Sequence, residues 1–105
     1  MIGAGSPFNV TAAGTDAGAT ATKAAATNKA HFVTHISGHT DTDSVIQILD
    51  GSTVMWESKI DISVEGFSFG FSVGMIPITP GAACSGVVAT STSDCQVNIE
   101  GFSIP

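Results

Sequence analysis

The chain has 105 residues and a formal net charge of −6, with nine acidic residues against three lysines and no arginine. Nucleic-acid binding draws most of its affinity from Lys and Arg neutralising phosphates, so this composition argues against a nucleic-acid partner and, for the same reason, against an anionic membrane. A chain of this length forms one compact domain, and its 43% apolar content is enough for a hydrophobic core.

The N-terminal region predicts an extended arm. Its first residues contain neither a basic stretch nor an apolar one, so we expect no signal peptide and assembly in a cytoplasm. Residues 1–15 are rich in Gly, Ala, Ser and Thr without clear periodicity. We interpret them as an arm, with Phe8 and Val10 available to dock on a neighbouring subunit, and place the folded domain at residues 16–105. Deleting residues 2–14 is then expected to abolish attachment of the chain to its partner surface while leaving the domain folded.

The next two segments alternate as strands do. Within residues 16–29, Ala alternates with Gly or Thr, which favours an edge strand over a helix despite the high alanine content. Residues 31–36 are β-branched and aromatic, and they predict a second strand that ends at Gly38.

A hairpin follows. Residues 44–49 and 53–60 both have strand character, and Asp50-Gly51 lies between them. These two residue types tolerate the positive φ of a tight turn, so they are a strong hairpin signal.

The clearest alternation lies in residues 66–75. Three phenylalanines occupy odd positions and Gly or Ser occupy even positions, so a strand here points its aromatic rings into the core. The opposite face is bare, which allows another sheet or chain to approach closely. The candidate subunit contacts are therefore Phe8, Val10, Ser68, Gly70 and Ser72.

Residues 84–89 and 95–104 predict a last hairpin, around a polar turn. That register separates Cys84 from Cys95 by about 20 Å along the strands. A disulfide needs Cα atoms within about 7 Å, so we expect no bond between them. With about eight short strands and no helical periodicity, the predicted fold class is all-β: a single β-sandwich or jelly-roll-like domain of antiparallel strands with an extended N-terminal arm.

One motif resembles a hydrolase signature. Residues 66–70 read G-x-S-x-G, a pattern that in hydrolases marks a sharp strand-to-helix turn under the nucleophile. Here the alternation continues through Ser68 and no helix follows. We interpret Ser68 as an outward strand residue, and we expect neither a catalytic residue nor a small-molecule substrate.

Histidines and aspartates are candidate metal ligands. His31, His35 and His39 recur every four residues, which on a strand separates neighbours by about 13 Å, too far to share one ion within a monomer. Asp41 and Asp43 lack the further ligands of an EF-hand loop. We expect no metal or other cofactor, but two alternatives stay open: histidines meeting across an oligomer axis, and a Ca²⁺ ion at the aspartates.

Several segments together carry a family resemblance. They are the Gly/Ala/Thr-rich arm, the histidine-bearing strand at 30–38, the Asp-Gly hairpin at 44–60, Gly-Phe-Ser-Phe-Gly-Phe followed by Met-Ile-Pro-Ile-Thr-Pro-Gly, and the closing Val-Asn-Ile-Glu-Gly-Phe. The pattern resembles small virion proteins of tailed bacteriophages, in particular capsid decoration (cement) proteins.

The resemblance implies a non-enzymatic structural subunit, often a homotrimer. Such a subunit lies on the capsid surface of the virion, where it binds and stabilises the major capsid protein. The alternative is a carbohydrate- or receptor-binding β-sandwich module of a phage tail or fibre.

Overall fold

The structure is a computed structural model, and it describes residues 6–14, 18–61, 66–71, 75–89 and 94–105. Within these ranges it contains nine strands, and no helix there has the length and apolar character of a membrane span. The strands are β1 (Ser6–Gly14), β2 (Ala19–Lys23), β3 (Ala30–Thr40), β4 (Ser44–Asp50), β5 (Thr53–Ile60), β6 (Gly66–Gly70), β7 (Ile76–Pro77), β8 (Cys84–Ala89) and β9 (Cys95–Ile104).

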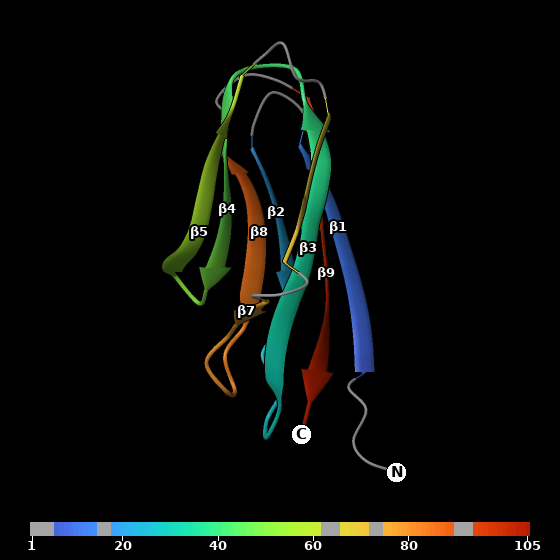
Figure 1. Cartoon of the computed structure of the whole chain (residues 1–105), viewed down its shortest axis with the longest axis vertical. Coiled ribbons are helices and arrows are strands. Elements are labelled where there is room, and N and C mark those ends of the chain that lie inside the picture. The colour runs from blue at the N-terminus through green and yellow to red at the C-terminus, as the bar shows by residue number, and fades with distance from the viewer. Residues whose placement is uncertain (1–5, 15–17, 62–65, 72–74, 90–93) are drawn as a thin grey trace.

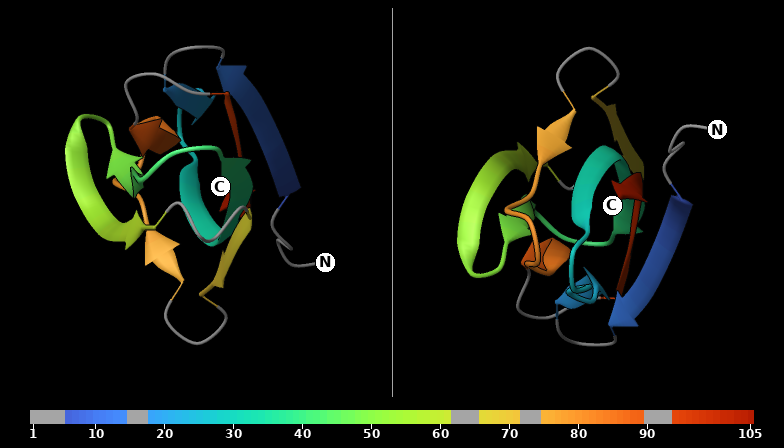
Figure 2. Two further views of the ribbon diagram at one scale, coloured as in Figure 1. Left: turned by 90° about the horizontal axis from the view of Figure 1, so that it is seen from above. Right: turned by 90° about the horizontal axis from the view of Figure 1, so that it is seen from below.

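The strands form two sheets that pack face to face. Sheet A has the order β1-β9-β3-β6, and the short β7 also pairs with β3. Sheet B has the order β2-β8-β4-β5. Every pair is antiparallel, and Figure 1 and Figure 2 show the two layers from the side and along the strands. The predicted all-β sandwich is confirmed.

The core lies between the sheets and follows the period-two pattern of the strands. Each large aliphatic side chain buried there contributes about 1.5–3 kcal/mol of hydrophobic free energy. Trp56 of β5 closes one side of the sandwich by packing against Phe69 and Phe71, with ring centroids 4.9 Å and 5.2 Å away. The fully buried aliphatic residues are Val33, Ile36, Ile46, Ile48, Val88, Val97 and Ile99.

The prediction of a separate arm at residues 1–15 is wrong for residues 6–14. These residues form an edge strand of the sandwich. β1 pairs with β9 along its whole length. Phe8 is buried, with its ring 5.7 Å from the His31 ring in an edge arrangement and 5.6 Å from Lys23 Nζ. Phe8 therefore docks on its own core, and deleting residues 2–14 would remove part of the fold. Residues 1–5 and 15 lie outside the described residues.

The predicted C-terminal hairpin is also wrong in its pairing. β8 pairs with β2 and β4 in sheet B, whereas β9 pairs with β1 and β3 in sheet A, so the chain crosses between sheets after β8. Cys84 and Cys95 are both buried and no disulfide joins them, although the hairpin register from which we expected this is wrong.

The other predicted elements are confirmed with small changes of length. The β4–β5 hairpin turns at Asp50-Gly51, where Gly51 has a φ of 59°. β2 is an edge strand of sheet B. β3 continues beyond the end predicted at Gly38, because Gly38 and the next two residues stay paired with β9.

Candidate functional site

A β-bulge in β3 decides which side chains of sheet A face outward. The register against β9 shifts between Val33 and His35, so Thr34 is an extra residue. A regular strand would place His31 and His35 on one face, but the bulge turns His31 into the core and His35 outward. The Thr34 hydroxyl donates a hydrogen bond to the backbone oxygen of Glu100 at 3.3 Å.

His31 is a buried structural residue, so it is not placed to meet another histidine across an oligomer axis. Its Nε2 lies 2.9 Å from the carbonyl oxygen of Ala24, which can only accept, so Nε2 carries a proton. Its Nδ1 lies 2.6 Å from Ser103 Oγ. The side chain is 1% exposed, and both ring nitrogens have partners inside the fold.

The outward side chains of β1, β9, β3 and β6 form a grid that we call the platform. Each row crosses the four strands at one register position, and successive rows are two residues apart. The three polar rows are Asn9–Glu100–His35–Gly70, Thr11–Asn98–Ser37–Ser68 and Ala13–Gln96–His39–Gly66. The platform therefore consists mainly of short or uncharged side chains on extended backbone.

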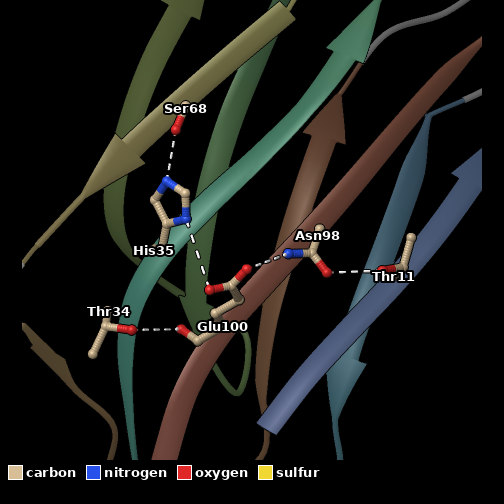
Figure 3. A network of polar contacts seen from close by, with 6 residues as sticks. All are labelled: Thr11, Thr34, His35, Ser68, Asn98 and Glu100. Carbon is tan, nitrogen blue, oxygen red and sulfur yellow. Dashed lines mark hydrogen bonds and ion pairs between the residues drawn. The ribbon is translucent and has the colours of Figure 1, made fainter.

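A polar network runs across the platform (Figure 3). Thr11 Oγ1 donates to Asn98 Oδ1 at 2.8 Å, and Asn98 Nδ2 donates to Glu100 Oε1 at 3.4 Å. Glu100 Oε2 lies 4.0 Å from His35 Nδ1, and His35 Nε2 is hydrogen-bonded to Ser68 Oγ at 2.6 Å. The network links all four strands and holds these side chains against the sheet.

An apolar row borders the platform at one end. Phe102 and Phe32 are directly opposite each other on β9 and β3, with ring centroids 5.2 Å apart and planes 15° apart. Pro7 flanks the pair on β1 and Pro77 flanks it on β7. The prolines are exposed and the phenylalanines are half-buried, so this row presents apolar surface beside the polar grid.

A shallow depression of about 430 Å³ lies between the apolar row and the first polar row. Its opening is bounded by Pro7 and Asn9 on β1, by Thr34 at the bulge and by Glu100 on β9. The depression gives the otherwise flat platform one recess that a side chain of a partner can enter.

The chain of contacts from Ser68 through His35 to Glu100 has the residue types of a catalytic triad but not its geometry. A triad needs a hydrogen bond between the imidazole Nδ1 and the carboxylate, and preorganised donors for an oxyanion. Here Nδ1 and the carboxylate are 4.0 Å apart, with the two side chains 32% and 45% exposed to water. Ser68 lies in the middle of β6, which confirms a strand in place of a nucleophile turn. We therefore interpret the three residues as a surface network.

Charge is distributed unevenly over the molecule. Of the acidic residues that the structure describes, Glu100 alone lies on the platform, although the chain carries a net charge of −6. A partner that covers the platform therefore desolvates one carboxylate, while the rest of the surface repels acidic partners.

The candidate metal ligands do not converge within the described ranges, where no group of three or more His, Cys, Asp or Glu side chains is placed to hold an ion. A second depression, of about 390 Å³, lies at the end of sheet B and includes Asp43, Lys59 and Asp61 in its lining. The lysine supplies a positive charge beside the two carboxylates, which disfavours a cation there.

The predicted contact residues fall into three groups. Ser68 and Gly70 are exposed on the platform, as the alternation indicated. Phe8 and Val10 point inward and pack with the core, so they are not surface contacts. Ser72 lies outside the described residues. The sequence analysis missed Phe32, His35, Asn98, Glu100 and Phe102, because they become neighbours only through the pairing of β3 with β9.

Comparisons with known proteins support the fold. No family model matches the chain, and no curated protein sequence matches it either. The chain is similar in structure to the CBM36-1 domain of a multidomain xylanase from the hindgut metagenome of Trinervitermes trinervoides, with a TM-score of 0.51, 10% identity, and coverage of 94% of this chain and 96% of that domain. At this identity the similarity shows a shared β-sandwich.

A more distant similarity is to a protein in the structure of Tomato Aspermy Virus. It has a TM-score of 0.33 and 11% identity, and it covers 96% of this chain and 79% of that one.

Proposed function

We propose that this chain is a structural virion protein that binds the outer surface of a phage capsid through the platform. The platform itself is the observation that carries the proposal. It is a broad face of mainly short or uncharged side chains on paired, extended strands, with one carboxylate among the described residues. Covering such a face orders few flexible side chains and desolvates little charge, so both costs of association are small.

The platform and the bordering apolar row together share two features of a protein-binding face, few charged side chains and an aromatic pair. Interface centres are depleted in charged residues and enriched in aromatic ones. The Phe32–Phe102 pair with its two prolines provides the apolar anchor, and the network from Thr11 to Ser68 provides hydrogen-bonding groups beside it. The partner that the sequence resemblance suggests is the major capsid protein, and in this proposal the chain lies on the capsid surface.

The test is co-sedimentation of the purified chain with empty shells of the major capsid protein from the same phage genome. Ser37→Arg places a long charged side chain at the centre of the platform, and we expect it to weaken binding at least about tenfold. Thr20→Arg makes a matched charge change at an exposed position of β2 in sheet B, and binding should stay unchanged. Equal binding by the two variants, or no binding by the unmodified chain, would refute the proposal.

A second candidate function is a carbohydrate-binding module of a phage tail or fibre. The stacked Phe32–Phe102 pair beside hydrogen-bonding side chains is the arrangement that favours it, since sugars pack their apolar faces on aromatic rings and bond through hydroxyls. The similarity to a CBM36-1 domain of a xylanase is compatible with this function. Glycan-array binding that Phe102→Ser abolishes, without shell binding, would favour this candidate over the first.

A further inference from the structure

The exposed edge of sheet B is a second surface that the proposed function does not use. β5 is the last strand of the sheet order β2-β8-β4-β5, and it lies at the outer side of the molecule in both Figure 1 and Figure 2. Among the described residues its ladder partner is β4. An edge strand leaves backbone N–H and C=O groups unpaired along one side, and these groups can pair with a further strand.

β5 has some of the features that protect an edge strand, namely the charged side chains of Glu57 and Lys59 and a bulge at one end. It contains no proline, and no charged side chain points inward from it, so its regular part can still accept a strand of complementary charge. Val54 and Met55 are the large apolar side chains most exposed among the described residues, at 48% and 43%. The register against β4 shifts where Met55 is the extra residue, so the irregular part of the edge is confined to that end. From Trp56 to Ile60 the strand is regular.

The regular part of the edge is complementary to itself. Glu57 and Lys59 are both exposed and point away from the core, whereas Trp56 and Ile60 point toward it. We propose that two copies of this chain pair through β5 in an antiparallel, two-fold arrangement centred on Ser58. Each Glu57 is then opposite Lys59 of the other copy, and Trp56 is opposite Ile60.

The neighbouring registers are less favourable. Residues that are opposite each other in the two copies must point to the same face of the joined sheet. The alternative registers therefore differ in which residue of β5 lies on the two-fold axis. Centring the pair on Glu57 or on Lys59 places like charges directly opposite each other, which destabilises a strand pair. Centring it on Trp56 places Glu57 opposite Met55. The charge pattern therefore favours the register in which the two-fold axis passes through Ser58.

The pairing would join the four-stranded sheets of two copies into one eight-stranded sheet. It involves five residues of each chain, which is a small contact, and interfaces below about 1,000 Å² are typically weak or transient. We therefore expect a dissociation constant between about 1 µM and 1 mM in solution. The dimer takes the place of the homotrimer that the family resemblance suggested. It uses sheet B, so it leaves the platform on sheet A free for another surface.

Sedimentation velocity of the full chain, from about 10 µM to about 1 mM, tests the pairing. The unmodified chain should pass from monomer to dimer over this range. Glu57→Lys and Lys59→Glu each replace two attractive pairs by two repulsive ones, and each should weaken the dimer at least about tenfold. The double variant E57K/K59E restores opposite charges and should recover the dimer. Circular dichroism of each variant checks that the sandwich is folded.

The charge-swap recovery separates this pairing from any other association. A chain that stays monomeric at the highest concentration, or that forms a trimer, overturns the proposal. Loss of the dimer in the double variant as well overturns the Ser58-centred register. Shell binding by Ser37→Arg is a separate measurement, so failure of the dimer and failure of the capsid proposal are distinguishable.

Discussion

Gly86 of β8 in sheet B lies directly against Ile99 of β9 in sheet A. A methyl group added to Gly86 would overlap Ile99 Cγ2 and would lie 3.2 Å from Ile36 Cδ1. Both isoleucines are fully buried, so neither side chain can move into solvent. The spacing between sheets A and B at this point therefore depends on the absence of a side chain in β8.

Gly86→Ala is expected to lower the free energy of unfolding by about 1–3 kcal/mol, the usual cost of overfilling a packed core. Gly66→Ala is the matched control, because its nearest neighbour would be a backbone oxygen at an ordinary 3.7 Å. Urea denaturation followed by Trp56 fluorescence measures both. Equal stability of the two variants would show that the sheets can move apart at no cost.

His31→Ala should destabilise the domain more than the same substitution at the exposed His39. It removes a fully buried ring and leaves the Ala24 carbonyl and the Ser103 hydroxyl without their partner. We expect a loss of about 2–4 kcal/mol from the cavity and the unsatisfied polar groups together. His39→Ala, at an exposed position of the same strand, should stay within about 0.5 kcal/mol of the unmodified chain. Similar losses in both variants would contradict the structural role of His31.

The strands and their pairing show which parts of the fold the sequence could predict and which it could not. Local alternation correctly located most of the strands, though not β1, together with the Asp50-Gly51 hairpin and the outward position of Ser68, since each depends on neighbours in the chain. Pairing between distant segments has no local signal. For this reason the expected β8–β9 hairpin was wrong, although the two segments are close together in sequence.

The platform could not be predicted for the same reason. Its Thr11–Asn98 hydrogen bond joins residues 87 apart in sequence. The reversal of His31 and His35 depends on one extra residue, Thr34, in the ladder with β9. A one-residue shift exchanges the two faces of a strand. Missing the extra residue Thr34 is therefore enough to assign His31 to the wrong face.

Deleting residues 2–14 is now expected to destabilise the domain. The deletion removes the whole of β1 from the edge of sheet A, including the buried ring of Phe8. Truncating a buried Phe to Ala already costs about 3–5 kcal/mol, a large part of the 5–15 kcal/mol typical of a small domain. Deletion of residues 2–5 is the control, because it leaves the paired length of β1 intact. Equal melting temperatures for the two truncated chains would contradict the placement of β1 in the sandwich.

The stability of the domain should fall in alkaline solution because of Cys84. Burial, aided by the nearby Asp50 carboxylate and opposed by Lys23, raises the pKa of the Cys84 thiol to about 11. The unfolded chain loses this proton near pH 8.5, whereas the folded chain keeps it, so the folded state binds more protons between these values. The free energy of unfolding therefore decreases as the pH rises from about 9 to about 11, while below that range the contribution is fully present.

Cys84→Ala isolates this effect from that of Cys95, whose thiol pKa burial also raises. Urea midpoints measured at steps from pH 7 to pH 11 should decline less steeply in the variant than in the unmodified chain. Thiol reactivity gives a second readout, since the thiolate is the nucleophile. At pH 8 the folded chain should react slowly with Ellman's reagent and rapidly after unfolding. Parallel stability profiles for the two chains, together with fast labelling of the folded protein, would show that Cys84 is accessible to water.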